Sequence, residues 1–180
     1  RRSQLAGERL IGELRVPFSA RAAHSSRRRR LTGEVSVRGC HAGGMSSVAF
    51  DVVPVSPALG AEIRGLDLAA PLDPPTVAEL RRAFNEHQVL FFRDQCLTPE
   101  QQITFGRCFG ELGTHPYVDA NPDHPEVIDI VTEPTDRVNF GGGWHTDVTF
   151  LPEPDLGSIL YAVELPPVGG DTLFASQLVA

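Results

Sequence analysis

Residues 141–150 read Gly141-Gly142-Gly143-Trp144-His145-Thr146-Asp147-Val148-Thr149-Phe150, a glycine run that becomes the alternating pattern of a strand. In a strand, residues two apart point to the same face, with Cα atoms about 6–7 Å apart. His145 and Asp147 would therefore lean toward one point. An imidazole nitrogen and a carboxylate oxygen placed in this way can share a metal ion. The stretch predicts His145 and Asp147 as metal ligands.

A His-x-Asp pair alone is a weak signal, because most such pairs are a surface histidine near a surface acid. Here the pair belongs to a longer string, Trp-His-Thr-Asp-Val-Thr-Phe, which precedes Pro152-Glu153-Pro154. Further motifs occur on both sides of it: Leu59-Gly60-Ala61-Glu62-Ile63-Arg64-Gly65, His87-Gln88-Val89-Leu90-Phe91-Phe92-Arg93-Asp94-Gln95, Phe109-Gly110-Glu111-Leu112, His115-Pro116 and Gly169-Gly170-Asp171-Thr172-Leu173. Together, from about residue 48 to residue 180, they resemble the TauD/TfdA family of Fe(II)- and 2-oxoglutarate-dependent oxygenases, which includes taurine dioxygenase.

The resemblance implies a mixed α+β fold, mainly β, with a double-stranded β-helix (jelly-roll) core and flanking helices. In this family a distal histidine completes the metal site, and an arginine shortly after it pairs with the 2-oxoglutarate carboxylate. This chain reaches neither position. We therefore expect residues 45–180 to be the N-terminal part of a TauD/TfdA dioxygenase domain, with the C-terminal part of the fold missing.

The resemblance also implies roles for single residues. Fe(II) would be bound by His145, Asp147 and the distal histidine, and the hydroxyl of Thr172 would help to bind 2-oxoglutarate. His115 would contact the substrate. Val148 and Phe150 match residues that line the substrate pocket, although both are equally compatible with core positions of a strand.

The implied reaction is hydroxylation of a small anionic organic substrate by O2, coupled to decarboxylation of 2-oxoglutarate to succinate. Taurine or another alkylsulfonate, with release of sulfite, is the first expectation. An asparagine that positions taurine in the taurine enzyme is replaced here by glycine, and Asn139 stands two residues away, which counts against taurine itself. The alternatives are the same chemistry on an alkyl sulfate or a phenoxyacetate-type carboxylate, or an inactive truncated fragment.

Residues 1–44 differ from the rest in composition. They carry ten arginines and three glutamates, a net charge of +7, and include the block Arg27-Arg28-Arg29-Arg30. Such a segment buries too little apolar surface to offset its ordering entropy. We expect a disordered extension or mistranslated upstream sequence, with Met45, the only methionine, as the true start. A nucleic-acid arm or a transit peptide is the functional alternative.

The remaining residues carry a net charge of −14, which argues against broad nucleic-acid binding. No apolar run is long enough to span a membrane. Cys40, Cys96 and Cys108 form no CxxC motif, so we expect reduced thiols in a cytoplasmic protein. The expected partners are a small anionic substrate and O2, and the family resemblance implies a homo-oligomer.

Local patterns predict the regular elements. Thr76-Val77-Ala78-Glu79 has the form of a capping box that begins a helix over residues 76–87, with His87 at its end. Thr98-Pro99-Glu100-Gln101 begins a second helix that runs to about Phe109. Strands are expected in five further segments: 48–55, 59–63, 89–92, 127–131 and 157–164, the last beside the His-x-Asp strand, and another strand starts at residues 172–175.

Overall fold

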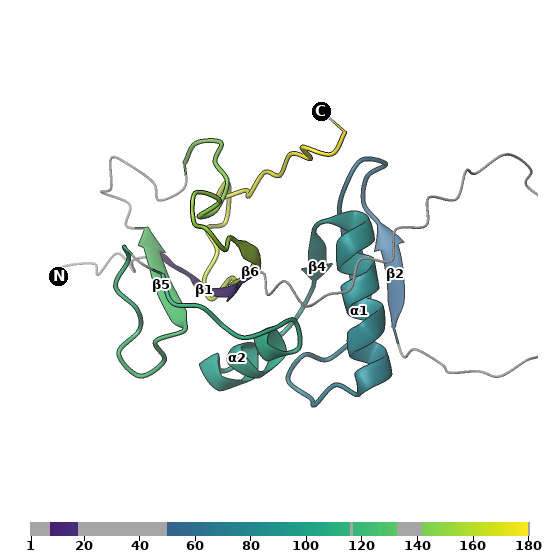
Figure 1. Ribbon diagram of the computed structural model, residues 1–180, viewed down its shortest axis with the longest axis horizontal. Coiled ribbons are helices and arrows are strands. Elements are labelled where there is room, and N and C mark those ends of the chain that lie inside the picture. Colours follow the sequence, from purple (N-terminus) through teal and green to yellow (C-terminus); the bar gives the residue numbers. More distant parts are fainter. Residues whose placement is uncertain (1–7, 18–49, 116, 133–141, 180) are drawn as a thin grey trace, which may run out of the picture.

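The computed structural model describes residues 8–17, 50–115, 117–132 and 142–179 (Figure 1). These residues form mixed helices and strands, as expected. The elements in chain order are β1 (Glu8–Pro17), β2 (Asp51–Pro54), β3 (Ala61–Arg64), α1 (Pro74–His87), β4 (Leu90–Phe92), α2 (Pro99–Arg107), β5 (Val127–Thr132) and β6 (Asp155–Tyr161). The strands make two three-stranded sheets, ordered β2-β3-β4 and β5-β1-β6.

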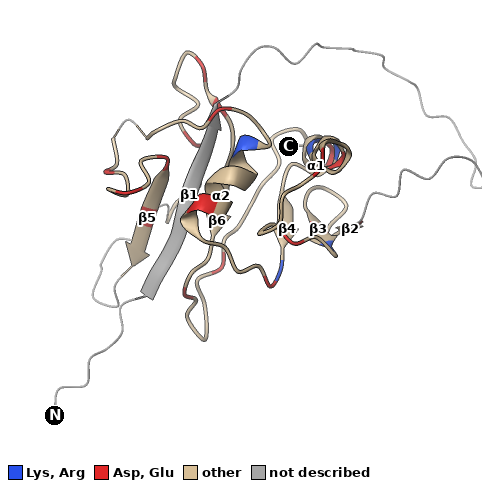
Figure 2. Cartoon of the chain, turned by 90° about the horizontal axis from the view of Figure 1, so that it is seen from below, with Lys and Arg blue, Asp and Glu red and all other residues tan. Residues whose placement is uncertain are grey.

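The first sheet packs against α1 (Figure 2). β2 runs antiparallel to β3 as an edge strand, and β3 runs parallel to β4. The main apolar core lies here: Leu80 is fully buried and is joined by Ile63, Leu68, Ala83 and Phe105. The opposite face of α1 carries the charged pairs that Arg82 makes with Glu79 and Glu86. This helix therefore has the two-faced character that its apolar spacing predicts.

The start of α1 differs from the prediction. The N-cap is Asp73, three residues before Thr76, and its carboxylate Oδ1 accepts a hydrogen bond from the Thr76 amide at 2.9 Å. Pro74 then occupies the first helical turn, where its missing N–H leaves no hydrogen bond unmade. Thr76 is buried inside the helix. The helix start predicted from the capping-box pattern at Thr76 was therefore wrong. The aspartate followed by proline at residues 73–74 is the start signal that the helix uses. His87 is the last residue of the helix, as predicted.

Helix α2 begins as predicted. Thr98 and Gln101 form a complete capping box, in which each side chain accepts from the other residue's backbone N–H. The helix ends at Arg107, two residues earlier than expected, and a turn follows. The Arg81 guanidinium of α1 donates to the Cys108 carbonyl at 2.8 Å, which satisfies one of the carbonyls left over at the end of α2.

The second sheet includes ten residues of the N-terminal segment. Residues 8–17 form β1, the central strand of the sheet, antiparallel to β5 and β6 on its two sides (Figure 1). Alternating residues such as Leu14 and Val16 suit a strand, and an edge-to-edge partner on both sides supplies the backbone hydrogen bonds that a short segment lacks alone. The proposed division at Met45 and the remainder of residues 1–44 lie outside the described residues.

Strand β6 contacts α1, α2 and the segment before α2. Gln102 of α2 donates from Nε2 to the Ile159 carbonyl at 3.3 Å. The hydroxyl of Tyr161 accepts from the Leu97 amide at 3.1 Å and donates to the Gln95 carbonyl at 3.4 Å. Gly157 lies so close to α1 that a Cβ there would come within 3.0 Å of the Phe84 ring. These contacts fix the position and register of β6.

Residues 162–179 contain no strand, contrary to the prediction for residues 172–175. A strand needs a neighbour to satisfy its backbone groups, and within the described residues neither sheet extends to this segment. Two contacts connect it to the first region: Phe174 packs edge-on against Phe91 of β4, and Ser176 donates at 2.7 Å to Oε1 of Gln88, the C-cap of α1. Many of its apolar side chains are exposed, namely Val163, Leu165, Val168, Leu173, Leu178 and Val179.

Candidate metal centre

His145 and Asp147 do come together, although not as the sequence suggested. Residues 144–150 form an irregular segment and a turn rather than a strand, and β6 pairs with β1 instead of with them. The His145 Nε2 atom nevertheless lies 3.2 Å from Asp147 Oδ1. Both side chains are open to solvent, 56% and 39% exposed. A turn can bring residues two apart to one point as well as a strand can, so the prediction of convergence holds on different geometry.

The other ring nitrogen of His145, Nδ1, has a hydrogen-bond partner of its own. Nδ1 lies 2.7 Å from the Gly143 carbonyl oxygen. A carbonyl only accepts hydrogen bonds, so Nδ1 carries the proton. Nε2 is therefore the ring nitrogen that faces Asp147. A backbone carbonyl that fixes the tautomer in this way is the usual support of a metal-ligating histidine.

The donor set fits a divalent metal ion. A lone pair on Nε2 and a carboxylate oxygen 3.2 Å away repel each other unless a proton or a cation lies between them. Two adjacent ligand atoms, each about 2.1 Å from one ion, lie about 3 Å apart, close to the observed separation. Among the described residues no group of three or more His, Cys, Asp and Glu side chains converges. The part of the chain that the structure describes thus offers two candidate ligands.

Val148 anchors the turn that carries the two ligands. Its side chain is 5% exposed, and its backbone has a φ of +37°. Positive φ is costly for a β-branched residue, and such strain persists only where packing enforces it. The Leu151 amide closes the turn by donating to the Val148 carbonyl at 3.0 Å. The burial of Val148 agrees with the core alternative, and its predicted contact with substrate stays a prediction.

A row of aromatic rings links the predicted substrate residues. The His115 ring lies edge-on to Tyr117, with centroids 6.3 Å apart, and Tyr117 lies 6.2 Å from Phe150. Tyr117 and Phe150 are exposed. The Tyr117 amide donates to His115 Nδ1 at 3.1 Å, so the neutral His115 ring carries its proton on Nε2. His115 and Phe150 therefore both contact the Tyr117 ring, a residue to which the sequence gave no firm role. Phe150 is three residues from Asp147 along the chain.

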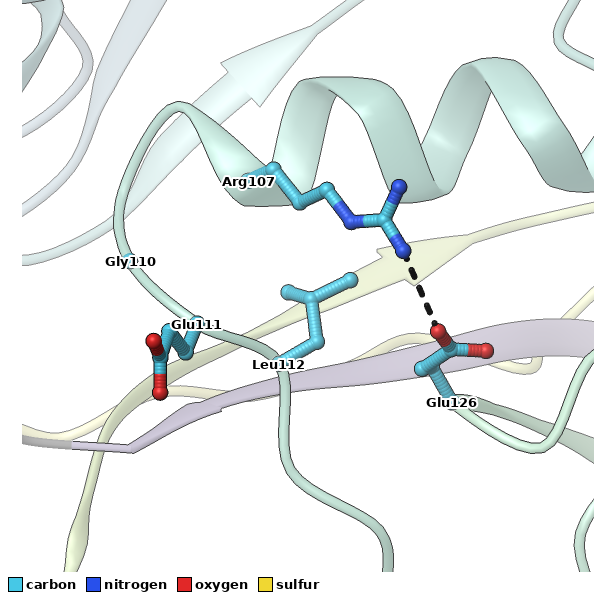
Figure 3. A pocket seen from close by; sticks show the side chains of 5 residues that line it. All are labelled: Arg107, Gly110, Glu111, Leu112 and Glu126. Carbon is cyan, nitrogen blue, oxygen red and sulfur yellow. Dashed lines mark hydrogen bonds and ion pairs between the residues drawn. The ribbon is translucent and has the colours of Figure 1, made fainter.

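Other predicted features lie elsewhere. Thr172 is exposed in the segment that follows β6, and its role in binding 2-oxoglutarate is untested. A hollow of about 510 Å³ lies between the end of α2 and the start of β5 (Figure 3). Arg107 spans it in an ion pair with Glu126 at 3.3 Å. None of the predicted site residues lines this hollow. Cys96 and Cys108 are free thiols, and burial raises the pKa of Cys108.

Ser158 is a neighbour of the candidate site that the sequence did not reveal. Its hydroxyl donates to Asp147 Oδ2 at 3.3 Å, whereas His145 Nε2 faces the other carboxylate oxygen, Oδ1. No spacing rule joins two residues eleven positions apart across a turn and a strand. The available signal was weak: a serine at an outward-facing position of a strand that otherwise alternates between half-buried and exposed residues.

In the described residues, two helices, two small sheets and an exposed histidine–aspartate pair define an α+β arrangement with a candidate site for a single metal ion. The chain belongs to the family described as taurine catabolism dioxygenase TauD, TfdA, whose sequence profile matches residues 51–180. The matched range contains both candidate ligands and every other residue predicted for the site. No helix in the described ranges is both long and apolar enough to cross a membrane.

Three relatives show the range of the family. The chain is 37% identical over 135 residues to an alpha-ketoglutarate-dependent sulfate ester dioxygenase of Pseudomonas putida, covering 74% of this chain and 44% of that protein. It is 36% identical over 137 residues to an (S)-phenoxypropionate/alpha-ketoglutarate-dioxygenase of Sphingobium herbicidovorans, covering 74% and 47%. A solved taurine dioxygenase from Burkholderia xenovorans has 42% identity, with a TM-score of 0.41, over 43% of this chain and 28% of that one. The chain spans about half the length of the curated relatives it matches.

Proposed function

We propose that this chain is the metal-ligand-bearing part of an Fe(II)- and 2-oxoglutarate-dependent dioxygenase with a double-stranded β-helix core. The observation that carries the proposal is the approach of His145 Nε2 and Asp147 Oδ1 to 3.2 Å inside the family-matched range. When bound, iron and 2-oxoglutarate would supply the oxidising chemistry, in which O2 is consumed and succinate and CO2 are formed. The chain's own contribution is to hold the ligands and the substrate.

The two histidines have complementary forms for these tasks. In His145 the Nδ1–H group donates to the Gly143 carbonyl at 2.7 Å, so Nε2 is the ring nitrogen left to bind a metal ion. In His115 the Tyr117 amide donates to Nδ1, which places a proton on Nε2 for donation to an anion. This difference supports His145 as a ligand and His115 as a substrate contact, with Tyr117 and Phe150 providing an apolar wall beside it.

The proposed substrate is a small organic anion, with an alkylsulfonate such as taurine as the first candidate. The relatives support the wider class, because they are named for a sulfate ester, a phenoxypropionate and taurine. Incubation of a protein that carries this chain and spans the full family length with taurine, hexyl sulfate and phenoxyacetate separates these options. Release of sulfite, sulfate or phenol, each matched by succinate, identifies the class. Absence of succinate with every anion contradicts the proposal.

Metal binding can be tested on the 180-residue chain itself. Trp144 is the only tryptophan, is exposed, and directly precedes His145, so its fluorescence reports on this site. Under anaerobic conditions we expect saturable quenching by Fe(II) that weakens at least about 100-fold in His145→Ala and Asp147→Ala. We expect little or no visible charge-transfer band on adding 2-oxoglutarate, because the described residues supply two ligands. If neither substitution changes the quenching, the metal ion binds elsewhere and the two residues are not its ligands.

A further inference from the structure

We infer that Ser158 is a positioning residue for the metal centre, an inference that rests on the proposed function. Its hydroxyl donates to Asp147 Oδ2 at 3.3 Å, while Asp147 Oδ1 faces His145 Nε2 at 3.2 Å. The two carboxylate oxygens therefore have different neighbours. One is held by a strand residue, and the other is directed at the partner ligand.

This arrangement decides how Asp147 can bind. A free carboxylate rotates about its side-chain torsion and can offer one oxygen or both to a cation. With Oδ2 engaged by Ser158, Oδ1 alone is presented beside His145. Binding through a single oxygen occupies one coordination position and leaves room for further ligands, which a centre that must also admit a cosubstrate and O2 requires.

The position of Ser158 comes from the packed part of the molecule. Along β6, Gly157 faces the Phe84 ring, and the Ile159 carbonyl accepts from Gln102 of α2. Tyr161 is bonded at its hydroxyl to the segment between β4 and α2. Because side chains alternate along a strand, Gly157 and the Tyr161 side chain lie on one face of β6 and Ser158 lies on the other. Asp147 lies on an exposed turn, so its hydrogen bond to Ser158 on the packed strand β6 restricts the orientation of its carboxylate.

The test compares Ser158→Thr with Ser158→Val. The two side chains have the same shape, suit a strand equally, and differ in that only threonine keeps the hydroxyl. Fe(II) affinity is read anaerobically from the quenching of Trp144 in the 180-residue chain, with His145→Ala defining the site-specific signal. Hydrogen-bonding partners of metal ligands typically contribute 10–100-fold to affinity. Because the Ser158–Asp147 hydrogen bond is 3.3 Å long and exposed to solvent, we expect an effect at the low end of this range. The Kd for Fe(II) should be about tenfold higher in Ser158→Val and within about twofold of the parent in Ser158→Thr.

Leu160→Ala is the matched control, since Leu160 is the next exposed residue on the same face of β6. It should leave Kd unchanged, and thermal unfolding should show that all variants fold. Equal Kd values for Ser158→Val and Ser158→Thr, with the dependence on His145 intact, would overturn the role of Ser158 alone. If Fe(II) quenches Trp144 equally in the parent chain and in His145→Ala, the proposed function and this inference are both overturned.

Discussion

The two sheets of this chain are built differently. The β2-β3-β4 sheet packs against α1 over a core in which Leu80 is fully buried, and its strands are connected locally. The β5-β1-β6 sheet combines segments from the beginning, middle and end of the chain. The exposed His145–Asp147 pair lies beside it, because Ser158 of β6 donates to the Asp147 carboxylate. Stability is concentrated in the first region and candidate chemistry in the second, and they meet at β6.

The strongest test of this division is to break the second sheet and ask whether the first survives. Leu14 of β1 is aligned with Val127 on one side and Ile159 on the other. Leu14→Pro removes a backbone N–H in the middle of the central strand. We expect amide hydrogen exchange to accelerate across residues 127–132 and 155–161, while residues 74–87 keep their protection.

Leu10→Pro is the control, because Leu10 lies at the irregularity in register between Arg9 and Gly12. It should have a smaller effect. Unchanged protection of β5 and β6 in Leu14→Pro would show that β1 is not their central strand.

The next test weakens the first region. Leu80→Ala deletes a side chain with 0% exposure, and substitutions of this kind cost about 2–5 kcal/mol of unfolding free energy because a cavity remains. Chemical denaturation followed by circular dichroism measures the loss. Leu178→Ala makes the same chemical change at a residue that is 79% exposed and should stay within about 0.5 kcal/mol of the parent. Similar losses in both variants would remove the distinction between the regions.

The smallest expected effect concerns the start of α1. Hydrogen bonds from Thr76 hold the pKa of Asp73 below its ordinary value of 3.8. The ionised carboxylate therefore stabilises the folded state above pH 3.8, and this contribution is lost as the pH falls through the lowered pKa. Asp73→Asn keeps a capping side chain without the charge. The stability difference between parent and variant should be constant near pH 6 and shrink below about pH 4. A difference that does not change between pH 6 and pH 3 would contradict the assignment.

The sequence predicted local elements better than long-range pairing. Helix caps, helical spacing and short apolar strands depend on neighbours within a few residues, so β2, β3, α1, β4, α2, β5 and β6 were anticipated to within a few residues. The family-typical string singled out His145 and Asp147, whose side chains approach each other although the strand assumed for them is a turn. Their role as metal ligands stays a prediction. The role of residues 8–17 was missed because pairing with β5 and β6 has no local signal. Ser158 was missed for the same reason.

The central position of β1 also has a consequence in time. Leu14 and its partner Val127 are more than 100 residues apart in the sequence, and Ile159 is farther still. At typical synthesis rates of about 5–20 residues per second, β1 leaves the ribosome roughly 5–20 s before either partner strand exists. All elements of the helix-covered sheet are made within that interval. The β5-β1-β6 sheet can therefore close only as a late step, onto a first sheet that has already had time to form.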